Sequence, residues 1–182
     1  METAIVSVIC IALIVIGGMT MSQGFLTSVD TTSAALEELG VRDEEIMRTE
    51  LTPISANTTI TGNILYVTLE NSGQTKLADF NRWDVIVQYY DGGATYHTKW
   101  LPYTDGTPGN NEWTKKGIYL NTENKTEEVP EVFEPAILNP GEKIKIEAKL
   151  NPSAGEDTAN LVVISTPNGI PASVSFSGPS GY

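Results

Sequence analysis

The residue types that usually perform catalysis or bind metals are scarce in this sequence. His97 is the only histidine, and the only cysteine, Cys10, lies far from it in an apolar run. Zinc sites and nucleophilic triads need several such groups at defined spacings, so neither is expected. His97 is predicted to be a surface or cross-strand histidine, and Cys10 to pack as a small apolar side chain without a disulfide. We therefore expect a protein that is not an enzyme and that uses no cofactor or metal.

Carboxylates are plentiful but scattered along the chain. Asp79, Asp84 and Asp91 lack the regular spacing of a calcium-binding loop. Asp105, which precedes a stretch rich in glycine and asparagine, comes nearest to one. No glycine-rich loop of the phosphate-binding types occurs. The carboxylates therefore predict an acidic, solvated surface.

Sequons of the form Asn-x-Thr begin at Asn57 and Asn124. Both are predicted to lie in turns or loops of a domain outside the cell. Asn57 and Asn124 are therefore candidate acceptors of N-linked glycans.

Charge excludes one class of partner. The chain has 182 residues and a formal net charge of −12, from 23 acidic and 11 basic residues. Binding to nucleic acid needs a basic face against the phosphates, so no nucleic-acid partner is expected.

An uncharged run over residues 3–29 opens the chain, and the first basic residue after it is Arg42. Three interpretations compete for this run. A secretory signal peptide needs a basic start and an apolar core of only about 7–15 residues, so it fits poorly. A membrane anchor fits the length, because about 20 apolar residues span a bilayer as a helix. The third interpretation is a polymerisation helix, which waits in the membrane and is then withdrawn into the core of a filament.

Apolar residues populate every side of the expected helix, as a polymer core requires. Beyond residue 29 the pattern becomes amphipathic as far as Leu39, and Gly40 is predicted to end the helix in the left-handed conformation. The chain is therefore predicted to divide into a membrane or polymerisation helix over residues 1–40 and an outer β-domain over residues 41–182. The residues predicted to mediate polymerisation are Val8, Ile9, Ile11, Leu13, Ile14, Val15, Phe25, Val29 and Leu36.

After residue 41 the apolar period changes from helical to alternating. Short alternating segments separated by Gly, Pro, Asn and Asp, without helices between them, predict an antiparallel β-sandwich of immunoglobulin-like kind. Residues 102–117 are predicted to form a long surface loop with at most a short strand at Trp113, and residues 123–135 an acidic excursion. The expected strands are residues 47–54, 63–70, 83–90, 94–101, 143–150, 160–166 and 170–177.

The strand over residues 143–150 carries lysines on one face. Lys143, Lys145 and Lys149 alternate with apolar residues. A solvated face that protects a sheet edge explains them. The alternative is contact with an acidic loop of a neighbouring subunit, which contains Glu127, Glu128, Glu131 and Glu134.

Two stretches of the β-domain carry a resemblance to a known family. Residues 66–80, YVTLENSGQTKLADF, followed by WDVIVQYYDG, resemble the strand, Asn-x-Gly turn and second strand of archaellins. Residues 139–150, NPGEKIKIEAKL, resemble their Pro-Gly-Glu turn and alternating strand. The apolar helix followed at once by an all-β domain is similar to theirs as well. One departure is the short basic leader of archaellin precursors, which is not seen before the apolar run.

The resemblance implies a structural subunit of an extracellular helical filament of the archaellum type, which serves swimming. Its implied partners are further copies of the chain in a homopolymer, the membrane before assembly, and the archaellum or pilus assembly machinery. The implied location is a filament at the cell surface. Two alternatives stay open. One is an adhesive pilus subunit of the type IV pilin kind, and the other is a membrane-anchored minor archaellum or envelope protein that binds the surface layer or a stator partner.

Overall fold

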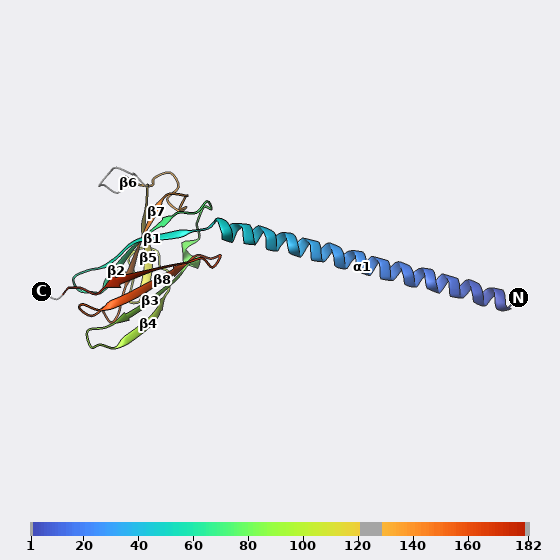
Figure 1. Cartoon of the computed structure of the whole chain (residues 1–182), viewed down its shortest axis with the longest axis horizontal. Helices are drawn as coiled ribbons and strands as arrows, with labels where there is room; N and C mark the ends of the chain where they lie inside the picture. Colours follow the sequence, from blue (N-terminus) through green and yellow to red (C-terminus); the bar gives the residue numbers. More distant parts are fainter. Residues whose placement is uncertain (1, 121–128, 181–182) are drawn as a thin grey trace. The chain divides into compact units, whose positions relative to one another are not determined.

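The computed structural model describes residues 2–120 and 129–180, and it contains one long helix and a β-domain (Figure 1). The chain divides into two compact units, Met1–Glu44 and Glu45–Tyr182. The division falls inside the helix α1, which spans Glu2–Arg48.

Helix α1 continues beyond Gly40, so the prediction that this glycine ends the helix is wrong. One glycine in a helix interior costs only about 1 kcal/mol relative to alanine, and the residues after it favour a helix. Glu44 and Arg48 stand four positions apart with the acid first, and Arg48 lies in the last turn, where a positive charge complements the helix dipole.

Thr49, a buried residue, ends the helix. Its hydroxyl donates to the Glu45 carbonyl at 2.8 Å, and the Gln74 amide donates to the Arg48 carbonyl at 2.7 Å. Gly73 allows this approach, because a Cβ there would lie 2.6 Å from the Arg48 carbonyl oxygen. The predicted start of the first strand at residue 47 is therefore wrong: β1 begins at Leu51.

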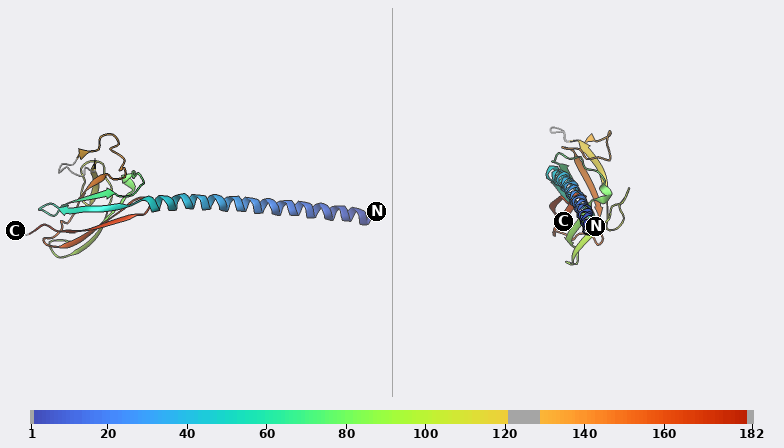
Figure 2. Two further views of the ribbon diagram at one scale, coloured as in Figure 1. Left: turned by 45° about the horizontal axis from the view of Figure 1, so that its top comes forward. Right: turned by 90° about the vertical axis from the view of Figure 1, so that its right-hand side faces the viewer.

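Nine described strands form two antiparallel sheets (Figure 2). Their orders are β1-β2-β7-β5-β6 and β4-β3-β8-β9, and a short 3-10 helix, η1, spans Phe80–Arg82. The strands are β1 Leu51–Thr58, β2 Ile64–Asn71, β3 Asp84–Tyr90, β4 Tyr96–Leu101, β5 Glu112–Leu120, β6 Val129–Pro130, β7 Lys143–Lys149, β8 Ala159–Ser165 and β9 Pro171–Ser177.

The inward faces of both sheets contribute to one apolar core. Leu65, Val67 and Leu69 of β2 are buried, and so are Val85 and Val87 of β3, all at the alternating spacing of a half-covered strand. Strands β3 and β4, and likewise β8 and β9, pair as antiparallel hairpins close to the predicted strand ranges. A long helix followed by a β-sandwich is therefore the observed architecture.

Strand β5 is the main element that the sequence did not predict. Trp113, expected in a surface loop, is fully buried, and β5 lies between β7 and β6. A register shift between Lys115 and Gly117 interrupts the alternation of buried and exposed residues. Because of this bulge and the polar residues around it, the segment lacks the regular apolar–polar alternation by which a strand is predicted.

The lysine strand β7 lies inside its sheet, between β2 and β5, so the prediction of a protected sheet edge is wrong. Lys143 pairs across the ladder with Glu70, and Lys149 with Glu112. Acids of the same chain therefore stand opposite two of the lysines, and such cross-strand pairs favour the sheet. Contact of this face with a neighbouring subunit stays a prediction.

Candidate functional site

His97 is a cross-strand residue, as expected. It pairs with Tyr89 across the β3–β4 ladder, and its Nε2 lies 2.8 Å from a carboxylate oxygen of Asp91. The hydrogen bond to His97, followed by one from the Thr95 amide, holds the pKa of Asp91 below its ordinary value. Burial, with a smaller effect of the Asp91 charge, raises the pKa of Tyr89 to about 12. These contacts close the hairpin turn.

Asp105 uses its carboxylate within the chain. It accepts a hydrogen bond from the Tyr103 hydroxyl at 2.8 Å, and Glu112 accepts one from the Gly109 amide at 2.7 Å. In residues 2–120 and 129–180, no group of three or more His, Cys, Asp or Glu side chains is placed to hold a metal ion.

The sequon at Asn57 lies in strand β1, so its predicted place in a turn is wrong. Asn57 is exposed and pairs with Tyr66 of β2. The hydroxyl of Thr59, the third residue of the sequon, donates to the Asn63 side chain at 3.1 Å. Asn124 lies outside the described residues.

Helix α1 exposes its apolar side chains on every side. Within the described part of the chain it is the one helix long and apolar enough to cross a membrane, and none of its most apolar window is buried. The predicted polymerisation residues are not brought together by the fold. Their exposed fractions are Val8 66%, Ile9 54%, Ile11 62%, Leu13 64%, Ile14 73%, Val15 53%, Phe25 70%, Val29 44% and Leu36 63%.

Five hydroxyl side chains in α1 are satisfied by the helix itself, a feature that the sequence did not predict. Each donates to a backbone carbonyl one turn earlier, which removes a polar group that lipid or a helix bundle would otherwise have to accommodate. The bonds are Ser7 to Thr3, Thr20 to Ile16 and Gly17, Thr27 to Gln23, Thr31 to Thr27, and Thr32 to Ser28. Such a helix is suited to an environment without water.

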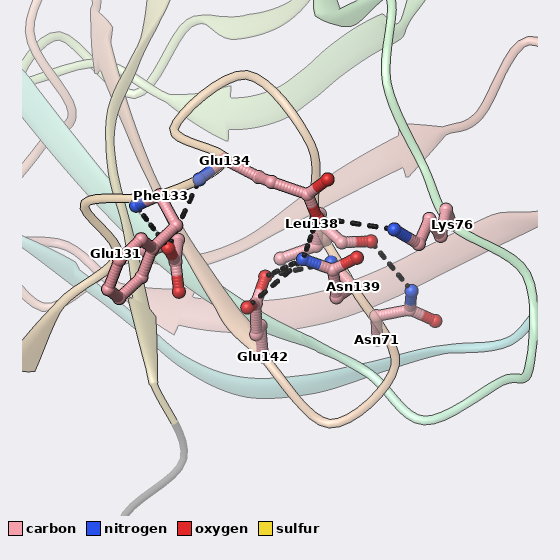
Figure 3. A network of polar contacts seen from close by, with 8 residues as sticks. All are labelled: Asn71, Lys76, Glu131, Phe133, Glu134, Leu138, Asn139 and Glu142. Carbon is pink, nitrogen blue, oxygen red and sulfur yellow. Dashed lines mark hydrogen bonds and ion pairs between the residues drawn. The ribbon is translucent and has the colours of Figure 1, made fainter.

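The two motif stretches of the β-domain meet at Asn71 (Figure 3). The buried Asn71 amide group donates to the Leu138 carbonyl at 3.0 Å, and its backbone exchanges hydrogen bonds with Gly141 and Glu142. Gly141 has a φ of 82°, which glycine adopts without strain. The carboxylate of Glu142 accepts the Asn139 amide at 2.8 Å. The Asn-x-Gly and Pro-Gly-Glu turns therefore form one connected structure.

A sequence profile of the archaeal-type flagellin family matches residues 1–176, which includes α1 and almost the whole β-domain. The chain belongs to this family. No curated protein sequence matches it.

Solved structures share the fold with the chain at low sequence identity. The archaeal flagellum of Methanospirillum hungatei strain JF1 has a TM-score of 0.59 at 12% identity, covering 97% of this chain and 93% of that one. Archaeal flagellin FlaB1 from Methanocaldococcus jannaschii has a TM-score of 0.52 at 14% identity, covering 74% and 92%. The archaellum periplasmic stator protein FlaG from Sulfolobus acidocaldarius has 0.50 at 22% identity, covering 70% and 99%.

Family membership assigns the chain to a structural class. As an archaeal-type flagellin it is a structural subunit of a filament that assembles from its own copies outside the cell. The predicted family, fold class and filament role are confirmed.

Proposed function

We propose that α1 forms the core of an archaellum filament that serves swimming, and that the β-domain forms its outer shell. The observation that carries this proposal is the exposure of apolar residues on all sides of α1. Exposed apolar surface costs about 25 cal/mol per Å² in water, so the helix needs lipid or other helices around it. Copies of the same helix supply such surroundings in a filament.

The same helix also suits a stage in the membrane before assembly. At 1.5 Å per residue, its 47 residues make a rod of roughly 70 Å, more than twice the hydrocarbon thickness of a bilayer. The uncharged residues 3–29 are long enough to occupy the lipid. Transfer from lipid to a helix bundle exchanges one apolar environment for another, so its free energy is small. The assembly machinery then has to guide the helix into the filament without overcoming a large free-energy cost.

A second candidate function rests on the likeness to archaellum stator proteins. The FlaG likeness covers 99% of that chain, and the complex of FlaF and FlaG from the same organism is similar at 23% identity. In this alternative α1 stays in the membrane as an anchor, and the β-domain binds a component of the cell envelope. The likeness to the Methanospirillum hungatei filament supports the first proposal, because it extends over 97% of the chain.

Fractionation of producing cells tests the two proposals against each other. Surface filaments are sheared off, purified and analysed by mass spectrometry and electron microscopy, and the membranes are analysed in parallel. The filament proposal predicts that the chain is a stoichiometric component of the filaments. Its retention in the membranes, with filaments that lack it, would support the anchored alternative and contradict the proposal.

A further inference from the structure

The β-domain carries two exposed apolar surfaces that its own fold leaves uncovered. The first, the knob, consists of Val132 and Phe133, which are 72% and 90% exposed. The second, the aromatic face, consists of Tyr90, Tyr96 and Trp100 on strands β3 and β4, which are 42%, 51% and 59% exposed. Large apolar side chains at such exposure mark interaction surfaces when they cluster.

Hydrogen bonds hold the knob in one conformation (Figure 3). A carboxylate oxygen of Glu131 accepts the amide of Phe133 at 2.6 Å and that of Glu134 at 3.1 Å. The Phe133 ring is therefore presented on a turn whose backbone is already ordered. An apolar anchor that is ordered before binding loses little conformational entropy when it is buried.

The segment that follows the knob is fastened to the rest of the sheet. Glu134 pairs with Lys76 at 3.2 Å and accepts the Asn139 side chain at 3.1 Å. Lys115 of β5 donates to the Pro135 carbonyl. Leu138 is fully buried and forms a β-bridge with Leu77. These contacts make the knob a firm projection from the domain.

The aromatic face is ordered in the same way. The Trp100 indole N–H donates to Asp84 at 2.9 Å, and the Tyr96 hydroxyl donates to Gln88 at 3.1 Å. The rings of Tyr90 and Tyr96 lie 5.1 Å apart. Tyr and Trp held in this way are the residue types that most often dominate the energy of protein interfaces.

The ladder extends the aromatic face with apolar neighbours. Ile86 stands between Trp100 on one side and Val163 on the other, so an apolar row crosses β4, β3 and β8. The next pair along the ladder on this face is Thr98 with Gln88, and both are uncharged. The chain belongs to a family whose filament assembles from its own copies, so the partner for this apolar row is a second copy of the chain. Carboxylates border both surfaces, Asp84 beside Trp100 and Glu131 beside Phe133.

Strand β6, which precedes the knob in sequence, and strand β4, which carries Tyr96 and Trp100, lie at opposite ends of the β-domain in the views of Figures 1 and 2. A contact between two different surfaces of the same molecule is heterologous. Such a contact closes into a ring when the rotation between subunits closes, and it continues into an open helical assembly when the rotation does not close. The open helical assembly is the symmetry that a filament needs.

We propose that the knob of one subunit packs on the aromatic face of a neighbouring subunit in the filament shell. This inference rests on the proposed function, since it requires filaments in which outer domains of separate copies touch. Phe133 is the central anchor, and the rings of Tyr96 and Trp100 cover it from the partner's side.

Cross-linking between two single-cysteine variants tests the pairing. Both carry Cys10→Ala in the full chain; one adds Val132→Cys beside the intact Phe133, and the other adds Thr98→Cys on the aromatic face. Filaments from cells that produce both variants are treated with a short bismaleimide. We expect a cross-linked dimer in mixed filaments and none in filaments of either variant alone. Mixed filaments without the dimer, or dimers within one variant, would overturn the proposed contact.

A substitution pair provides a second readout that does not depend on cysteines. Phe133→Ser is expected to lower the temperature at which filaments dissociate, while the circular dichroism of the subunit stays unchanged; Phe133→Leu, which keeps an apolar knob, is expected to retain most filament stability. Equal dissociation temperatures for the parent and Phe133→Ser contradict the inference. The unmodified chain distinguishes failure of this contact from failure of the proposed function: if it forms no filament at all, the proposed function itself is refuted.

Discussion

Helix α1 and the β-domain use the same residue types in opposite ways. Ile14 of α1 is 73% exposed, whereas Ile144 of β7 is fully buried; Val8 is 66% exposed, whereas Val87 is fully buried. Burying one such side chain contributes about 1.5–3 kcal/mol. The β-domain obtains this stabilisation within one chain, and α1 obtains it only from lipid or from other copies. We therefore expect the β-domain to fold independently, and we propose that α1 serves assembly.

Lysine in the helix should break assembly while leaving the β-domain intact. Val8→Lys or Ile11→Lys places a charge in an apolar surrounding at about 2.5–3.5 kcal/mol per subunit in a membrane, and every copy in a filament carries it. We expect loss of filaments by electron microscopy and an unchanged β-domain spectrum. Ile60→Lys, at a residue 93% exposed near the end of β1, is the matched control and should preserve filaments. Normal filaments with lysine at position 8 or 11 would refute the role of α1.

Removing the buried indole should have the converse effect on the β-domain. Trp113 is fully buried between the sheets, so Trp113→Ala is expected to lower the free energy of unfolding by about 3–5 kcal/mol. Denaturant titration of the detergent-solubilised chain, followed by circular dichroism, measures it. Trp100→Ala, at the exposed aromatic face, should cost at most about 1 kcal/mol. Equal costs for the two tryptophans would contradict the assigned core.

Removing the side-chain hydrogen bonds of Asn71 should destabilise the β-domain less than removing Trp113. Asn71→Ala removes the side-chain hydrogen bonds to the Thr75 and Leu138 carbonyls, of which Leu138 keeps the Leu77 amide as a donor, at an expected cost of about 1–3 kcal/mol in the stability of the β-domain. Asn110→Ala, at an exposed asparagine, should change it little. The same denaturant titration serves both variants. An Asn71→Ala variant as stable as the parent would show that this network is dispensable.

Acid should loosen the knob before it affects the core. The amides of Phe133 and Glu134 lower the pKa of Glu131, and Lys76 with Asn139 lowers that of Glu134. A carboxyl whose pKa is lowered by folding stabilises the folded form above its unfolded pKa, and this contribution is lost as the pH falls through the folded pKa. Both pKa values lie below the ordinary 4.5, so the loss is expected below that pH.

Hydrogen exchange of the Phe133 amide, followed by NMR, measures this loosening. After correction for the intrinsic exchange rate, protection should fall below pH 4.5, and Glu131→Gln should remove most of that dependence. Protection that stays constant through this range would contradict the role of Glu131.

Much of the fold was predictable because its signals are local. Apolar and charged residues alternate strictly over residues 143–150, and this pattern predicts the strand that the structure shows as β7. The end of α1 was missed because one glycine is a weak helix breaker when charged helix formers follow it. Strand β5 was missed because a bulge near Gly117 interrupts the alternation on which the prediction depends.

Of the surfaces proposed to make contacts between subunits, the one on α1 was predictable from the sequence, and the two on the β-domain were not. The polymerisation residues of α1 follow from composition, and their role stays a prediction for filaments to test. Phe133 and Trp100 are residue types normally assigned to a core, and only the ladder register and the turn at Glu131 show that they point outward. One signal was present in the sequence: Val132 and Phe133 stand between Pro130 and Pro135, which disfavour a regular strand or helix over this short segment.

The accessibility of Cys10 tests the central claim most directly. This only cysteine lies in α1 and is exposed in the single chain. Intact filaments and filaments dissociated in detergent are treated with a water-soluble maleimide, with an Ile60→Cys variant as the control for an exposed thiol. If α1 forms the filament core, Cys10 is protected in intact filaments and reacts after dissociation, while the cysteine at position 60 reacts in both. Equal labelling of Cys10 before and after dissociation would contradict the account.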